Sequence, residues 1–278
     1  PHTFTYEMTL KRELPTSGVG VFEVRFPSPV VSDCPANNTV HTEYYRPLGT
    51  GPFPGAIVLD ITGGDQSLSR TICNCLAQSQ IAALFVQMAY YGPRRPPGSK
   101  LRLLSTNLPR TMDGIRQTVL DIRRATAWLE ARPEIDVQRL GIHGTSLGSM
   151  VGALAAETEP KLSRVSIALG GGGLVEAYYD HPRAAPYRKI WEKLGGSKET
   201  VARVLAPIDP ITCAANLKGR SVLMIAGKRD EIVPPSATEA LWKAAGKPKI
   251  VWYDCTHYGA ALYFGPILNE VVKHFKAE

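Results

Sequence analysis

One pentapeptide, Gly144-Thr145-Ser146-Leu147-Gly148, constrains this chain more than any other stretch. An apolar run of strand character, residues 139–143, comes before it, and a run of small helix-forming residues, 150–156, comes after it. A serine with a glycine two positions away on each side, between a strand and a helix, is typical of a sharp turn that lifts a nucleophilic hydroxyl above a sheet. Glycine is required at both positions because side chains there would collide with the neighbouring strand and helix.

The segments on either side of this motif alternate between strand and helix. Short apolar runs predict strands at 56–59, 81–88, 139–143, 164–169, 221–226 and 249–253. Helices are predicted at 68–77, 111–131 and 150–156, after Pro234-Pro235 up to Gly246, and along the last stretch, where Leu268, Val271, Val272 and Phe275 face inward. This alternation predicts an α/β fold with a doubly wound, mostly parallel sheet.

Two segments depart from the alternation. Residues 1–48 have β-branched and aromatic residues at alternate positions and a turn at 34–38, so they predict an antiparallel lead-in. Residues 170–218 begin with four glycines and continue into a stretch rich in tyrosine and charge. This stretch is interpreted as a small cap over the serine, the alternative being a longer crossover. We expect residues 1–278 to form one domain.

The composition favours a soluble globular enzyme. Of the 278 residues 44% are hydrophobic and 21% are charged, and no apolar run is long enough to insert into a membrane. The net charge of +7 comes without a nucleic-acid-binding motif, so no nucleic-acid partner is expected. Cys73 and Cys75 have metal-ligand spacing but no second pair, so no metal or other cofactor is predicted. The chain begins at Pro1 rather than Met, which indicates a removed segment and leaves open a cytoplasmic or an exported protein.

A serine hydroxyl needs a base to become nucleophilic, and that base needs an acid to orient it. Of the six histidines, His257 follows a late strand in a loop that can reach the serine at the sheet edge. Asp230 follows the strand at 221–226 and a turn, where an acid would meet this histidine. Asp254 is the alternative acid. The order Ser146, Asp230, His257 differs from that of the chymotrypsin and subtilisin types.

These residues resemble the α/β-hydrolase superfamily, whose members have the same order. Residues 56–64, 121–148 and 221–235 are most similar to its dienelactone hydrolase-like and bacterial acyl-esterase branches, and the resemblance covers about 50–275. It implies ester hydrolysis through an acyl-serine intermediate without a cofactor. Dienelactone hydrolases use a cysteine nucleophile, and this chain has Ser146 at that position.

Two loops are expected around the serine. The resemblance implies an oxyanion hole made by the backbone N–H of Leu147 and a second donor, Ile61 or Thr62, from the loop Asp60-Ile61-Thr62-Gly63-Gly64. Asp60 requires a cation or backbone donors near it. The loop at 89–98 supplies Tyr90 and Tyr91 as candidate pocket walls, together with Tyr258. Its arginines are interpreted as solvated, the alternative being that they bind a substrate carboxylate.

The sequence therefore predicts a serine carboxylesterase that acts on small ester substrates with short or compact acyl groups. A peptidase, an amidase or an acyltransferase would use the same three residues. A binding protein that keeps the fold without the chemistry is a further alternative. The sequence carries no signal for the oligomeric state.

Overall fold

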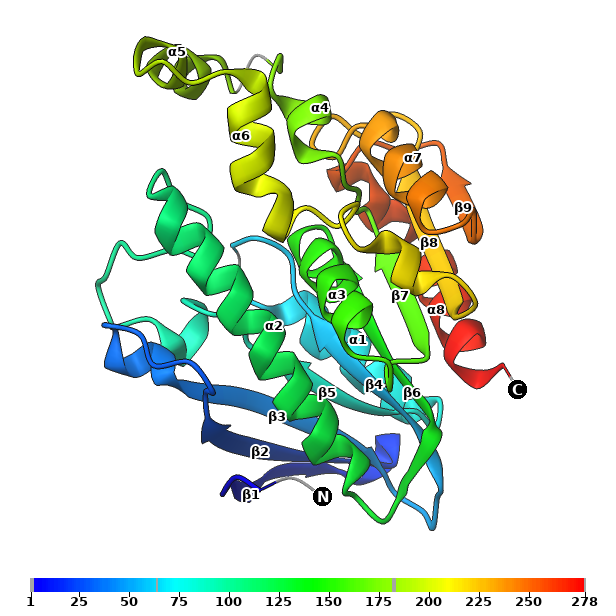
Figure 1. Ribbon diagram of the computed structural model, residues 1–278. Helices are drawn as coiled ribbons and strands as arrows, with labels where there is room; N and C mark the ends of the chain where they lie inside the picture. The colour runs from blue at the N-terminus through cyan, green and yellow to red at the C-terminus, as the bar shows by residue number, and fades with distance from the viewer. Residues whose placement is uncertain (1–2, 64, 182–183, 278) are drawn as a thin grey trace.

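The computed structural model of the protein describes residues 3–63, 65–181 and 184–277. Gly64 of the predicted oxyanion loop and residues 182–183 of the predicted cap lie outside the described residues, as do 1–2 and 278. Within the described part, nine strands form a single sheet (Figure 1). They are β1 (Glu7–Leu14), β2 (Val19–Pro27), β3 (Thr39–Pro47), β4 (Phe53–Leu59), β5 (Ala82–Val86), β6 (Ile135–Thr145), β7 (Arg164–Ala168), β8 (Ser221–Gly227) and β9 (Lys249–Tyr253).

The strand order confirms the predicted sheet. Along the sheet it is β1-β2-β3-β5-β4-β6-β7-β8-β9. The strands from β4 to β9 pair in parallel, whereas β1, β2 and β3 pair antiparallel to one another and β3 joins β5 in the same sense. Every residue of β4 is buried, as expected for a strand covered on both faces. The antiparallel lead-in is therefore an extension of the parallel sheet beyond β5.

Helices cover both faces of the sheet. The described helices are α1 (Ser67–Gln78), α2 (Leu108–Glu130), α3 (Leu147–Thr158), α4 (Leu174–Tyr178), α5 (Ala185–Lys193), α6 (Lys198–Leu205), α7 (Pro235–Ala244) and α8 (Phe264–Lys276). One apolar core lies between the sheet and α2, α3 and α7, and a second lies between the sheet and α1 and α8. No described helix is both long and apolar enough to cross a bilayer.

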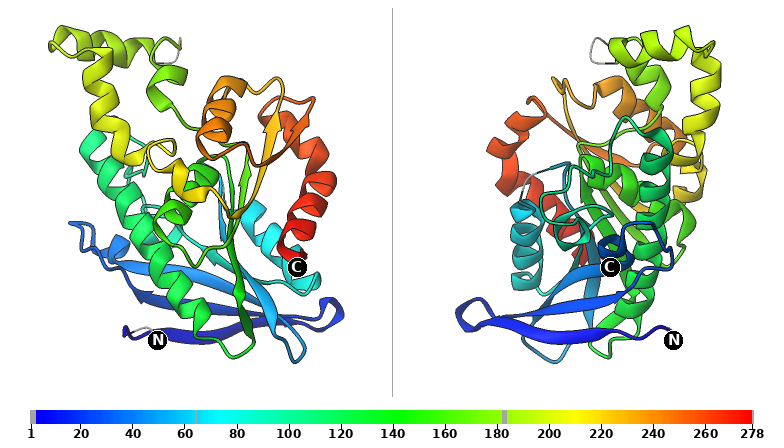
Figure 2. Two further views of the ribbon diagram at one scale, coloured as in Figure 1. Left: turned by 45° about the vertical axis from the view of Figure 1, so that its right-hand side comes forward. Right: turned by 90° about the vertical axis from the view of Figure 1, so that its left-hand side faces the viewer.

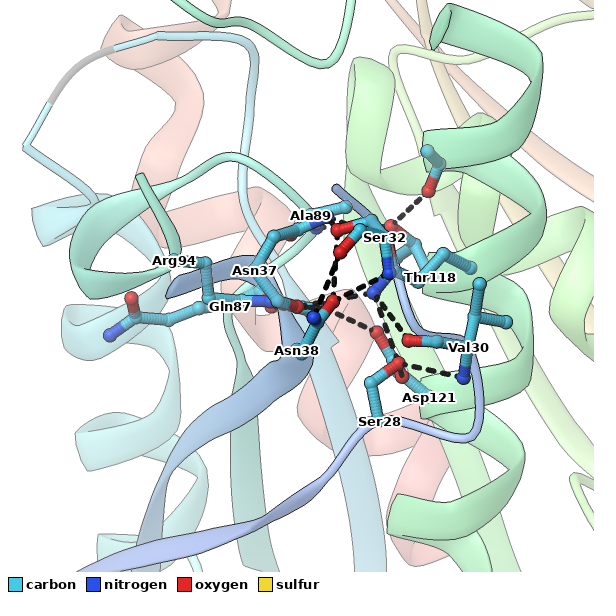
Figure 3. A network of polar contacts seen from close by, with 12 residues as sticks. Ser28, Val30, Ser32, Asn37, Asn38, Gln87, Ala89, Arg94, Thr118 and Asp121 are labelled. Carbon is cyan, nitrogen blue, oxygen red and sulfur yellow. Dashed lines mark hydrogen bonds and ion pairs between the residues drawn. The ribbon is translucent and has the colours of Figure 1, made fainter. Parts of the chain in front are cut away.

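A buried polar network attaches the lead-in to α2 (Figure 3). Arg94 and Asp121 form an ion pair at 2.7 Å, and the side chains of both are fully buried. Arg94 also donates hydrogen bonds to the backbone oxygens of Gln87 and Asn37, and Ser28 donates to Asp121. The interpretation of the arginines at 89–98 as solvated is therefore wrong for Arg94. Its charge is satisfied inside the protein, which also removes it as a partner for a substrate carboxylate.

The predicted cap segment forms short helices at one end of the molecule. Figures 1 and 2 show α4, α5 and α6 at the top of the molecule and β1 at the bottom, with α5 standing farthest from the strands. After α6 the chain returns over α2 and α3 through two short 3-10 turns, Ala206–Ile208 and Ala214–Leu217. The role of residues 170–218 as a cap stays a prediction, as does the single-domain boundary at 1–278.

Candidate active site

Ser146 lies in the sharp turn that its glycines predict. β6 ends at Thr145 and α3 begins at Leu147, and Ser146 between them has φ 53° and ψ −118°, a strained conformation for a residue with a side chain. A Cβ atom on Gly144 would lie 2.2 Å from the backbone oxygen of Gly148, and one on Gly148 would lie 2.5 Å from that of Asp60. Both glycines are therefore required by close backbone contacts, and the predicted strand–turn–helix is confirmed.

The structure brings Ser146, His257 and Asp230 together. His257 Nε2 lies 3.0 Å from Ser146 Oγ, and His257 Nδ1 lies 2.7 Å from Asp230 Oδ2. All three residues are at least nine-tenths buried. Because an ionised carboxylate only accepts hydrogen bonds, Nδ1 carries the proton and Nε2 is left to accept the serine hydroxyl.

Backbone N–H groups hold the carboxylate of Asp230 in place beside His257. The other carboxylate oxygen of Asp230, Oδ1, accepts hydrogen bonds from the N–H groups of Ile232 and Val233 at 2.9 and 2.8 Å. The alternative acid, Asp254, is exposed and pairs with Arg229 at 2.8 Å. The structure thus places Asp230, and not Asp254, beside the histidine.

The predicted oxyanion loop has a specific donor arrangement. Burial raises the pKa of Asp60, and hydrogen bonds from the N–H groups of Ile61 and Ser69, at 2.7 and 3.3 Å, act against this rise. These are the backbone donors that an acid at this position requires. The N–H of Ile61 is therefore already used, whereas that of Thr62 has no partner among the described residues. At the start of α3, the N–H of Leu147 is likewise without one in the described part of the chain.

A cavity of about 330 Å³ opens beside Ser146. Ile61 and Thr62 of the oxyanion loop line it, and so does Tyr258, which is 73% exposed. Tyr91 is placed differently, because its hydroxyl lies 3.2 Å from Thr62 Oγ1 and supports the loop. Tyr90 is buried in the core against Gly114 of α2 and is not among the described residues that line the cavity.

Most residues of the cavity wall are not predicted from the sequence. The wall includes apolar side chains of α1 and α8 and the buried His143 of β6. The helix residues follow an amphipathic pattern, which indicates burial but not whether a side chain meets a neighbour or a cavity. Among the described residues, no three His, Cys, Asp or Glu side chains are grouped so as to hold a metal ion, and Cys73 and Cys75 are free thiols.

Two family models match this chain. The model described as alpha/beta hydrolase domain containing 18 matches residues 2–169, and the prolyl oligopeptidase family model matches residues 114–255. Each match spans more than half of the chain. The chain belongs to the α/β-hydrolase superfamily. The fold and the elbow agree with this membership.

Individual relatives of this α/β-hydrolase are distant. An uncharacterized protein of Mycobacterium tuberculosis is 31% identical over 149 residues, which are 52% of this chain and 34% of that protein, so the match spans about a third of that relative. A probable 2-oxo-3-(5-oxofuran-2-ylidene)propanoate lactonase of Bradyrhizobium sp. is 27% identical over 163 residues, 59% of each chain. The solved structure of acetyl xylan esterase 1 from Thermoanaerobacterium sp. JW/SL YS485 shares the fold, with a TM-score of 0.74, 21% identity, and coverage of 96% of this chain and 88% of that one.

Proposed function

We propose that the protein is a serine carboxylesterase that hydrolyses small esters through an acyl intermediate on Ser146. One observation carries the proposal: a buried serine hydroxyl lies 3.0 Å from an imidazole that lies 2.7 Å from a buried carboxylate, at the wall of a cavity. An acetyl xylan esterase among structures of the same fold and a probable lactonase among the relatives support the same class of reaction.

The first half of the proposed reaction transfers the acyl group to the enzyme. As Ser146 Oγ attacks the ester carbon, His257 Nε2 takes the hydroxyl proton. Asp230 holds the ring in the required tautomer and stabilises the imidazolium that forms. The tetrahedral intermediate then collapses, the bond between the acyl carbon and the alcohol oxygen breaks, and the alcohol leaves with the proton from Nε2.

The negative charge of the tetrahedral intermediate needs donors that are already in place. We assign this role to the N–H of Leu147 and the N–H of Thr62, because that of Ile61 is bonded to Asp60. Leu147 also begins α3, so the positive end of the helix dipole faces the same oxygen. In the second half, water attacks the acyl-serine with His257 again acting as base, which releases the carboxylic acid and restores Ser146.

The experiment is hydrolysis of p-nitrophenyl esters by the wild type and two single variants. Ser146→Ala should reduce kcat by at least about 10³-fold because it removes the nucleophile. The control is Ser163→Ala. Ser163 comes just before β7, at the other end of the strands from Ser146, and its replacement should leave kcat unchanged. Equal rates for Ser146→Ala and the wild type would reject the assignment.

Amide hydrolysis is a second candidate, and the prolyl oligopeptidase family match favours testing it. The same three residues cleave an amide if His257 protonates the leaving amine effectively. p-Nitroanilides with the same acyl groups as the esters give a direct comparison. A kcat/KM for the anilides as high as for the esters would change the proposal from an esterase to an amidase or peptidase.

A further inference from the structure

The cavity beside Ser146 has a mostly apolar wall. Helices α1 and α8 contribute the apolar side chains of Leu68, Ile72, Phe264, Ile267, Leu268 and Val271 to it. Ile72 and Val271 are nearly fully buried, so the cavity extends inward between these helices and the sheet. No Lys, Arg, Asp or Glu is among the described residues that line it. A ligand in this space is therefore held by apolar contact.

The polar groups on the sheet side of the cavity carry no charge at neutral pH. His143 is 1% exposed, with its Nδ1 3.0 Å from Ser166 Oγ and its Nε2 3.4 Å from Thr145 Oγ1. Burial lowers the pKa of His143 to about 4, and nearby His274 acts in the same direction. A substrate carboxylate in this space would lose its water without gaining a cationic partner.

The position of His257 decides which half of an ester occupies the space between α1, α8 and the sheet. The leaving alcohol takes its proton from His257 Nε2, so it lies beside His257 and leaves past Tyr258, which is 73% exposed. The acyl group stays bound through both halves of the reaction. The enclosed wall of α1 and α8 therefore suits the acyl group, and the exposed side suits the alcohol.

The volume of the cavity limits the size of the acyl group that it can hold. At about 30 Å³ for each water-sized group, a cavity of about 330 Å³ holds roughly eleven such groups. The ester carbonyl and the first atoms of the alcohol occupy some of them. An acyl chain of about six to eight carbons fills what is left, whereas an acetyl group leaves most of the apolar wall without contacts.

We propose that the space between α1, α8 and the sheet is an acyl pocket that selects uncharged acyl groups of about six to eight carbons. This inference rests on the proposed esterase function and adds the acyl specificity of the same site. The sequence alone predicts short or compact acyl groups, and the cavity indicates acyl chains longer than acetyl.

The first test is a chain-length series on the wild type. With p-nitrophenyl esters from acetate to dodecanoate, kcat/KM should rise by about fourfold per methylene up to hexanoate or octanoate and then fall. The mono-p-nitrophenyl ester of suberic acid has the length of the octanoate ester but ends in a carboxylate. Its kcat/KM should be more than about tenfold below that of the octanoate. A maximum at acetate, or equal rates for these two esters, would overturn the inference.

A pair of neighbouring valines provides a matched control. Val271 lines the cavity, whereas the half-buried Val272 packs in the core beneath α8 and is not among the described lining residues. Val271→Phe should move the optimum to butyrate or shorter, and Val272→Phe should leave it at the wild-type length. Leu268→Ala enlarges the pocket and should move the optimum to longer chains. Identical profiles for all four proteins would refute the pocket assignment.

Binding to Ser146→Ala separates failure of the pocket from failure of the proposed chemistry. Calorimetry should detect methyl octanoate binding at concentrations where methyl acetate does not bind, and Val271→Phe in the same background should abolish it. If the wild type hydrolyses no ester but this binding pattern holds, the pocket stands and the esterase proposal fails. If the wild type hydrolyses acetate best and Ser146→Ala does not prefer methyl octanoate, the esterase proposal stands and the pocket fails.

Discussion

Glu157 gives the sharpest prediction about stability. It lies in α3, is 3% exposed, and neither of its carboxylate oxygens has a hydrogen-bond partner among the described residues. The pKa of Glu157 is raised to about 8, chiefly by burial, with the charge of Asp209 acting in the same direction and Arg220 opposing the rise. The guanidinium of Arg220 is engaged elsewhere, because it donates to the backbone oxygens of Ala156, Glu159 and Leu162.

The sign of the pH effect follows from this shift. Between the ordinary pKa of 4.5 and the folded-state pKa of about 8, the native state keeps a proton that the unfolded state has released. The free energy of unfolding therefore falls by about 1.4 kcal/mol per pH unit across this window. Release of this proton in the unfolded state lowers the free energy of unfolding by about 3 kcal/mol by pH 7, an order-of-magnitude figure.

Glu157→Gln removes the titration and keeps the shape. We expect it to equal the wild type near pH 4.5 and to be more stable by about 3 kcal/mol at pH 7, with the difference constant above pH 8. Urea unfolding at pH 5, 6, 7 and 8 measures this difference, and Glu239→Gln, a change at an exposed position on α7, is the control. A difference that does not change with pH, or a variant less stable than the wild type at pH 7, would refute the reasoning.

Three further predictions concern the buried ion pair and the site. Arg94→Met should lower the free energy of unfolding by about 3–5 kcal/mol, because it leaves Asp121 buried without its ionic partner. The double variant Arg94→Met/Asp121→Leu should recover most of the lost stability, as measured by urea titration. Gly148→Ala should lower esterase kcat by about 100-fold or more by displacing the elbow, whereas Gly152→Ala on the same helix has room and should retain it. Asp230→Asn should reduce kcat by about 10⁴-fold with little change in thermal stability.

The sequence predicts those features that depend on local pattern and chain order. Continuous apolar runs mark the parallel strands, and Gly144 and Gly148 mark the elbow. The carboxyl ends of parallel strands share one edge of the sheet, so the loops holding Asp230 and His257 had to come near Ser146. The contacts among these three side chains follow from topology more than from any single motif.

Other features depend on partners that are distant in the sequence. Arg94 sits in a loop rich in glycine, proline and arginine, which looks solvated, and only the fold brings it to Asp121. The choice between Ile61 and Thr62 depends on the side chain of Asp60, whose hydrogen bond to Ile61 no pattern indicates. Likewise, Ile72 and Val271 have the periodicity of core residues, and only the structure shows that they line a cavity.

The central claim is that Ser146 is the nucleophile. Incubation of the protein with a fluorophosphonate, followed by peptide mass spectrometry, measures this directly. We predict one modified residue, Ser146, with loss of esterase activity in proportion to labelling and no labelling of His257→Gln, which lacks the base. Modification of a different residue, or full activity after complete labelling of Ser146, would contradict the claim.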